Sequence, residues 1–109
     1  MINPADLNTP QYVLANLSTT SARVTLIATD INNSRVIIDN TAGSTPVFVQ
    51  SSVAGQTAVF PSSATAPSYG KVVGAGTVQT FRKSPQHVCI DAIRSSGTAD
   101  LYITVATGE

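Results

Sequence analysis

The residue types best suited to catalysis lie in one short segment, His87-Val-Cys89-Ile-Asp91. Alternate side chains on a β-strand point to the same side, so a strand here would place an imidazole, a thiol and a carboxylate on one face. An activated cysteine needs the imidazole within hydrogen-bonding distance, whereas neighbours along one strand stand side by side. Because Val88 and Ile90 are expected to face the core, we predict a structural strand whose three polar side chains are partly exposed.

Other chemical sites have equally little support in the sequence. Asp30-Ile-Asn-Asn-Ser lacks the central glycine and the later glutamate of a calcium loop, and it is typical of an Asx turn. The glycines between Gly70 and Gly76 lack the Lys-Ser/Thr pair and the βαβ unit of a phosphate-binding loop. With one histidine and one cysteine in the chain, no zinc site is expected. The sequence therefore predicts no catalytic residue, no metal site, no cofactor and no enzymatic activity.

Charged residues make up only 11% of the sequence, less than half the usual share of about 25%, and the formal net charge is zero. The basic residues are scattered, and only Arg82 and Lys83 are adjacent. Nucleic-acid binding and membrane anchoring both depend on clustered cations, so neither is expected. No apolar run approaches the ~20 residues that span a membrane. The N-terminal residues lack signal-peptide features, so we expect the protein to be made and used without secretion. A neutral surface of this kind tolerates docking against other protein.

Alternating apolar residues and many β-branched side chains predict an all-β protein. Branched side chains lose rotamer freedom in helices, and no segment shows a sustained helical period. Turn residues recur about every 8–12 positions, the spacing typical of a sandwich or barrel. The strands are expected at residues 11–17, 23–31, 35–40, 45–50, 57–60, 77–82, 87–93 and 100–105. The predicted fold is a single antiparallel β-sandwich or jelly-roll-like barrel of about seven or eight short strands.

Two pairs of these strands are predicted to form β-hairpins. Arg35–Asn40 and Thr45–Gln50 flank the turn-forming Thr-Ala-Gly-Ser, while Val88–Arg94 and Leu101–Val105 flank Ser-Ser-Gly-Thr-Ala-Asp. Two β-rich runs around a short turn are the usual hairpin signature. The uninterrupted apolar run Val47-Phe-Val49 indicates in addition that both faces of its strand are covered.

Residues 1–10 are predicted to be an N-terminal arm and residues 11–109 a β-sandwich domain. No charged residue occurs from Asn40 to Gly70, so residues 51–76 are expected to hold a short strand and a long loop packed on its own domain or on a neighbour, with a flexible low-complexity loop as the alternative. The arm and this segment are the predicted contact regions. Their candidate interface residues are Ile2, Pro4, Leu7, Phe60, Tyr69 and Val72.

Several stretches resemble small all-β structural proteins of tailed bacteriophage virions. They are Thr45-Pro-Val-Phe-Val-Gln-Ser-Ser, Ala58-Val-Phe-Pro-Ser-Ser, Val73-Gly-Ala-Gly-Thr-Val-Gln-Thr-Phe and Gly97-Thr-Ala-Asp-Leu-Tyr-Ile-Thr-Val-Ala-Thr-Gly-Glu. The likeness spans most of residues 35–109 and transfers no individual site residue. It implies a non-enzymatic virion protein, most directly a capsid decoration or cement protein that binds the outside of the major capsid shell and stabilises it.

The same resemblance implies partners and a location. The expected partner is the major capsid protein or another virion protein, and a homo-oligomer is expected, with a trimer favoured. The expected location is the virion, after synthesis in the host cytoplasm, with no nucleic acid, membrane or small-molecule substrate as partner. One alternative is a tail, neck or fibre-attachment protein. Another is a carbohydrate-binding β-sandwich module that stacks a sugar on Tyr69 or Tyr102.

Overall fold

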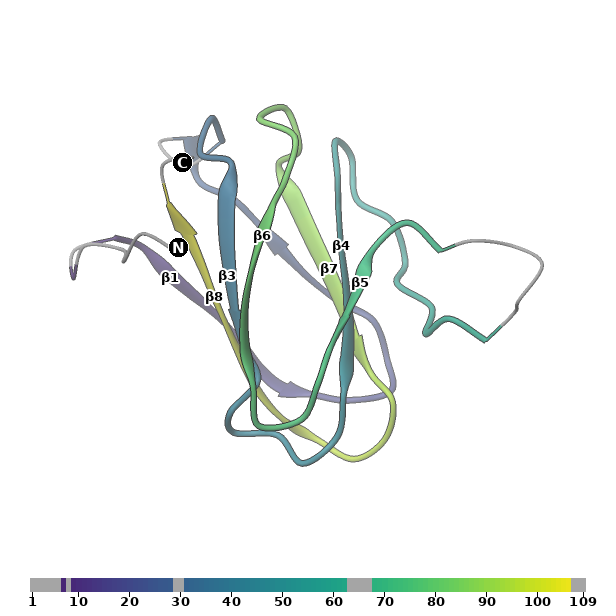
Figure 1. Cartoon of the computed structure of the whole chain (residues 1–109). Coiled ribbons are helices and arrows are strands. Elements are labelled where there is room, and N and C mark those ends of the chain that lie inside the picture. Colours follow the sequence, from purple (N-terminus) through teal and green to yellow (C-terminus); the bar gives the residue numbers. More distant parts are fainter. Residues whose placement is uncertain (1–6, 8, 29–30, 63–67, 107–109) are drawn as a thin grey trace.

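The computed structural model describes Leu7 and residues 9–28, 31–62 and 68–106. Two four-stranded antiparallel sheets face each other and enclose the core (Figure 1). The strands are β1 (Gln11–Leu17), β2 (Ala22–Thr25), β3 (Arg35–Asp39), β4 (Val47–Ser52), β5 (Lys71–Val73), β6 (Val78–Arg82), β7 (Cys89–Arg94) and β8 (Ala99–Ala106). Sheet A has the order β1-β8-β3-β6, and sheet B has the order β2-β7-β4-β5. The predicted all-β sandwich is confirmed.

The strand order is that of a jelly roll. Strand β1 pairs with β8, β2 with β7, β3 with β6 and β4 with β5, all antiparallel, which is the pattern of a long ribbon folded over on itself. Alternate side chains of each strand point between the sheets, and the core they form includes Val36, Ile38, Leu101, Ile103 and Val105. Full burial of each such side chain contributes about 1.5–3 kcal/mol, so this apolar layer holds the two sheets together.

Both predicted hairpins are wrong, because each turn carries the chain from one sheet to the other. Strand β3 lies in sheet A and β4 in sheet B, while β7 lies in sheet B and β8 in sheet A. Asn40 holds the first crossing from a fully buried position: its Nδ2 donates to the carbonyls of Thr45 (3.0 Å) and Gly74 (3.2 Å). A turn sequence predicts chain reversal, but it does not say whether the next strand pairs or crosses.

Arg94 ties the two crossings together. Its buried guanidinium donates from Nε to the Leu17 carbonyl (3.1 Å), from Nη1 to the Thr45 carbonyl (2.8 Å) and from Nη2 to the Ala99 carbonyl (3.3 Å). Loss of hydration on burial lowers the pKa of Arg94. A Cβ on Gly43 would overlap Arg94 Nη1 and Asn40 Oδ1, so a larger residue here would displace these two buried side chains. The sandwich therefore closes this end with buried polar groups rather than with tight hairpins.

Three smaller predictions can also be compared with the structure. The strand expected at 11–17 is confirmed as β1, whereas the one expected at 23–31 ends at Thr25 among the described residues. No strand forms at 57–60, and the short strand of this region is β5 instead. In the N-terminal arm only Leu7, Thr9 and Pro10 are described, so Ile2 and Pro4 lie outside the described residues.

Candidate functional site

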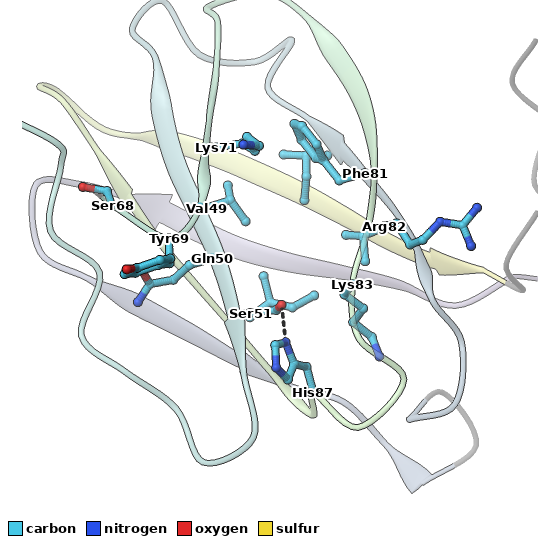
Figure 2. A pocket seen from close by; sticks show the side chains of 14 residues that line it. Val49, Gln50, Ser51, Ser68, Tyr69, Lys71, Phe81, Arg82, Lys83 and His87 are labelled. Carbon is cyan, nitrogen blue, oxygen red and sulfur yellow. Dashed lines mark hydrogen bonds between the residues drawn. The ribbon is translucent and has the colours of Figure 1, made fainter. Parts of the chain in front are cut away.

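The structure separates His87 from Cys89 and Asp91, the other two residues best suited to catalysis. Cys89 and Asp91 are both buried on the outer face of β7, so the prediction that they would be partly exposed is wrong. His87 precedes β7 and faces the space between the sheets, where its Nδ1 lies 2.7 Å from Ser51 Oγ (Figure 2). The imidazole therefore has a hydroxyl as its partner, and the carboxylate is committed elsewhere.

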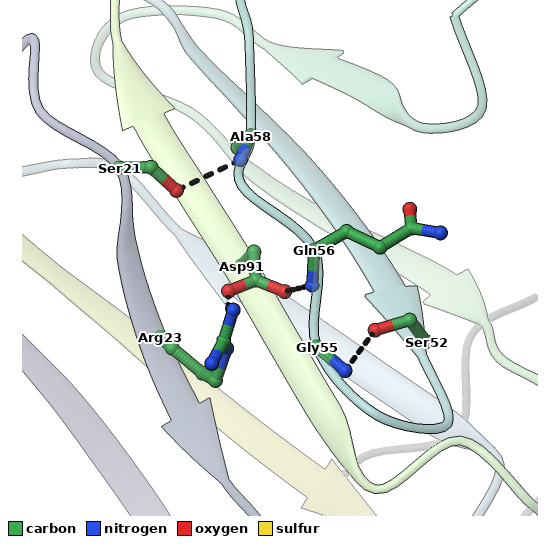
Figure 3. A network of polar contacts seen from close by, with 7 residues as sticks. All are labelled: Ser21, Arg23, Ser52, Gly55, Gln56, Ala58 and Asp91. Carbon is green, nitrogen blue, oxygen red and sulfur yellow. Dashed lines mark hydrogen bonds and ion pairs between the residues drawn. The ribbon is translucent and has the colours of Figure 1, made fainter.

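The Asp91 carboxylate binds a segment of the chain that crosses the outer face of sheet B. Asp91 is only 1% exposed, and it accepts hydrogen bonds from Arg23 Nε (2.8 Å) and from the backbone amide of Gln56 (3.0 Å) (Figure 3). Close by, the amide of Ala58 donates to Ser21 Oγ (2.8 Å). These contacts hold residues 53–62, here called the strap, against the sheet.

Aromatic packing completes the cover. The ring of Phe60 on the strap lies 6.4 Å from the ring of Phe48 at an interplanar angle of 58°, and Phe48 itself is buried. A tilted pair at this distance adds about 0.5–1.5 kcal/mol beyond the area it buries. The prediction that both faces of the Val47-Phe-Val49 strand are covered is thus confirmed, by core on one side and strap on the other.

The outer face of sheet A has a different character. Strand register places two adjacent rows of outward side chains across its four strands. The rows are Val13-Tyr102-Asp39-Val78 and Gln11-Thr104-Ile37-Thr80, here called the open face. All eight side chains stay exposed or half-buried. Asp39 is the one charged member, and its carboxylate accepts from the amide and hydroxyl of Thr41. The open face is therefore nearly neutral and partly apolar.

A pocket of about 360 Å³ lies between the two sheets on the side of β5 and β6 (Figure 2). Its apolar lining comprises Val36, Ile38, Val49, Phe81 and Ile90. Ser51, Lys83 and His87, here called the polar corner, also line it. None of the described residues that line it is acidic.

Lys83 is the least expected member of this lining. It is only 5% exposed, and its ammonium donates to the carbonyls of Ile31 (3.0 Å) and Ser84 (3.2 Å). Within the described part of the chain it forms no ion pair with a carboxylate. Burial lowers the pKa of Lys83, because the charged form loses hydration. The sequence contains one weak signal for the burial of Lys83: alternation places its side chain on the same side of the chain as Phe81.

Two of the predicted interface residues lie next to the same ring on the outer face of sheet B: Val72 is the register partner of Phe48, and Phe60 packs on Phe48. Leu7 and Tyr69 are strongly exposed, Val72 is exposed on β5, and Phe60 packs on the same chain through Phe48. Sequence analysis missed the open face, although the alternation in β1 and β6 does place Val13 and Val78 outward. It missed the face because the neighbours of those valines depend on strand register, which the sequence does not provide.

Two further observations concern metal binding and membrane-spanning helices. Among the described residues, no group of three or more His, Cys, Asp or Glu side chains is placed to hold a metal ion. The described residues also contain no helix with the length and apolar character needed to cross a membrane. The Asx turn predicted at Asp30-Ile-Asn-Asn-Ser begins at Asp30, which lies outside the described residues.

No protein-family model matches this sequence, and no curated protein matches it. Among solved structures, the chain is similar to a subunit from a study entitled "Bacillus endospore appendages form a novel family of disulfide-linked pili". The TM-score is 0.54 at 11% sequence identity, over 97% of this chain and 93% of that one. At this identity the likeness shows a shared fold.

Proposed function

We propose that this chain is a non-enzymatic structural subunit of a multi-copy protein assembly, and specifically a decoration protein on the outside of a virion shell. The observation that carries the proposal is the open face of sheet A. The chain covers part of the equivalent face of sheet B with its own strap, but among the described residues it leaves two rows of side chains exposed or half-buried on sheet A. Interfaces are depleted in charge, and Asp39 is the one charged residue among the eight in these rows.

The geometry of that face suits lateral docking. Val13 and Val78 stand at opposite edges of one row, with Tyr102 and Asp39 between them. Tyrosine is enriched at interfaces because its ring is apolar and its hydroxyl can bond to a partner. Apolar area buried by a partner stabilises the contact by about 25 cal/mol per Å², before the cost of association is subtracted.

Copy number in purified virions tests this proposal. Quantitative mass spectrometry would compare the amount of this chain with that of the major shell protein. A decoration protein is expected at one copy per shell subunit or one per few. A count typical of a single ring would move the chain to the tail or neck, and its absence from particles would overturn the virion proposal.

A filament subunit is the second candidate, and it rests on the shared fold with a subunit of endospore appendages. Those pili are described as disulfide-linked, whereas the single cysteine in this sequence, Cys89, is buried and unpaired. A filament of this chain would therefore assemble without a disulfide through that residue. Electron microscopy of the purified protein, with and without a reducing agent, separates the two: reductant-insensitive filaments would favour this candidate over decoration.

Glycan binding is a further alternative, supported by the placement of Tyr69. Its side chain is 83% exposed and lines the pocket between the sheets, where a sugar ring would find a platform. Glycan-array binding that disappears in Tyr69→Ala but not in Tyr102→Ala would favour this function. Absence of binding to any glycan would remove it.

A further inference from the structure

We infer that the pocket between the sheets binds a small carboxylate with an apolar body, such as a medium-chain fatty acid or an aryl carboxylic acid. The carboxylate would lie at the polar corner of Ser51, Lys83 and His87, and the apolar body along the core side chains that form the rest of the wall. This site is separate from the open face, so the inference does not depend on the proposed function.

The pocket has the dimensions and lining of a small-ligand site. Its volume of about 360 Å³ is at the small end of the roughly 300–1,000 Å³ found for ligand pockets. Such pockets are mainly apolar with a few polar groups that fix orientation. Here Ile38, Val49 and Ile90 supply the apolar wall, and the polar corner supplies the orientation.

The polar corner has hydrogen-bond donors to spare. Ser51 Oγ and His87 Nδ1 share one hydrogen bond of 2.7 Å. If the serine donates, the imidazole keeps an N–H at Nε2, and if the histidine donates, the serine keeps its O–H. Lys83 has three N–H donors, of which two bond to backbone carbonyls. Both tautomers therefore leave at least two donors that a carboxylate can use.

Charge selects an anion over a cation. Lys83 is buried at the same end of the pocket as His87, as Figure 2 shows, and no described acidic side chain lines the pocket. A buried ammonium without a counter-ion is costly, and a bound carboxylate would offset that cost. Lys71 adds a second cation, because its register partner Val49 belongs to the core and side chains paired across strands share a face.

Two ligands of equal length and opposite charge make the first test. Octanoate and octylammonium would each be titrated into the full-length protein at pH 7, with binding followed by calorimetry and by methyl NMR. Octanoate is expected to bind about tenfold or more tightly than octylammonium, as one charge-assisted hydrogen bond allows. Its shifts should fall on Ile38, Val49 and Ile90 and spare Leu14, which does not line the pocket.

Adjacent substitutions with the same change in charge make the second test. Lys83→Met removes the ammonium at the polar corner. Arg82 also lines the pocket, but its guanidinium end points away from it (Figure 2), so Arg82→Met removes a charge that a ligand at the polar corner would not contact. The first is expected to weaken octanoate binding about tenfold, and the second less than about twofold. If Lys83→Met does not fold, Ser51→Val takes its place, since valine suits a strand and removes one donor.

Three results would overturn the inference. One is equal binding of octanoate and octylammonium, which would mean hydrophobic adhesion without charge selection. Another is unchanged octanoate affinity in both Lys83→Met and Ser51→Val. The third is an absence of methyl shifts at millimolar octanoate, which would leave Lys71 and Lys83 as inward charges that protect edge strands from aggregation. None of these results bears on the copy number in virions.

Discussion

Several outward side chains on the central strands of sheet B are buried, whereas those in the two rows of the open face of sheet A are half-buried. On sheet B, Phe48 and Asp91 are each no more than 2% exposed, because the strap lies over them. On sheet A, the corresponding positions Tyr102 and Ile37 remain partly open to solvent. Both sheets have four strands in matching order, so strand pairing does not explain the difference.

This contrast shows what the chain needs for its own stability and what it leaves to others. The Asp91 carboxylate, the Gln56 amide and the Phe48–Phe60 pair hold the strap on sheet B, so the chain itself covers this part of the outer face. The open face of sheet A has no comparable cover among the described residues, yet it carries a single charge in two rows. Substitutions on sheet B should therefore change stability, and substitutions on sheet A should change assembly.

The largest effect is expected from Asp91→Ala. The change removes the acceptor for Gln56 and for Arg23, and so releases the strap from β7. Since the Arg23 side chain is 45% exposed, solvent screens part of the ion pair, and the expected loss is about 2 kcal/mol of unfolding free energy. Urea unfolding would measure it.

Asp39→Ala is the matched control, because this carboxylate lies on the open face and, among the described residues, bonds to nearby Thr41. Its expected cost is below about 1 kcal/mol. Equal losses for the two alanine variants would contradict the view that sheet B alone is completed by its own chain.

A smaller effect is expected from Phe60→Ala. The ring is half-buried against Phe48, so its removal should cost about 1–2 kcal/mol and open the outer face of sheet B. Tyr69→Ala removes a ring of similar size that is 83% exposed, and it should change stability by less than about 0.5 kcal/mol. Thermal unfolding of both variants would compare them; a Tyr69 loss as large as the Phe60 loss would contradict this account of the strap.

The sequence predicted the class of fold and most of the strands, because alternation and turn residues are local signals. It failed at the two connections, since the burial of Asn40 and Arg94 depends on carbonyl groups that come from distant strands. Both residues look like ordinary turn-flanking polar residues in the sequence. Only the assembled sandwich shows that their donors replace the hydrogen bonds a hairpin would have provided.

The candidate sites were less predictable for the same reason. In the charge-free stretch from Asn40 to Gly70, the strap bonds to its own domain through Gln56 and Ala58, whereas residues 61–62 and 68–69 of the predicted packed loop are exposed. The pocket escaped notice because Lys83 and His87 line it together with Ser51, about 30 residues away in sequence. Proximity of that kind follows from strand register and sheet pairing, for which the sequence has no local pattern.

The smallest effect on stability, and the most informative for function, is expected from Val13→Lys. Val13 is 52% exposed on the open face, and Val59 is 67% exposed on the strap, so one substitution at two sites tests the two faces with the same change in charge. Both variants should unfold within about 0.5 kcal/mol of the unsubstituted protein, since neither side chain is in the core. Val13→Lys should lower occupancy on purified particles about tenfold or more, because a lysine covered by a partner must lose its hydration, while Val59→Lys should bind normally. Occupancy measured by mass spectrometry decides the matter: a loss in Val59→Lys alone would move the docking surface to sheet B, and normal binding of both variants would remove both faces as docking surfaces.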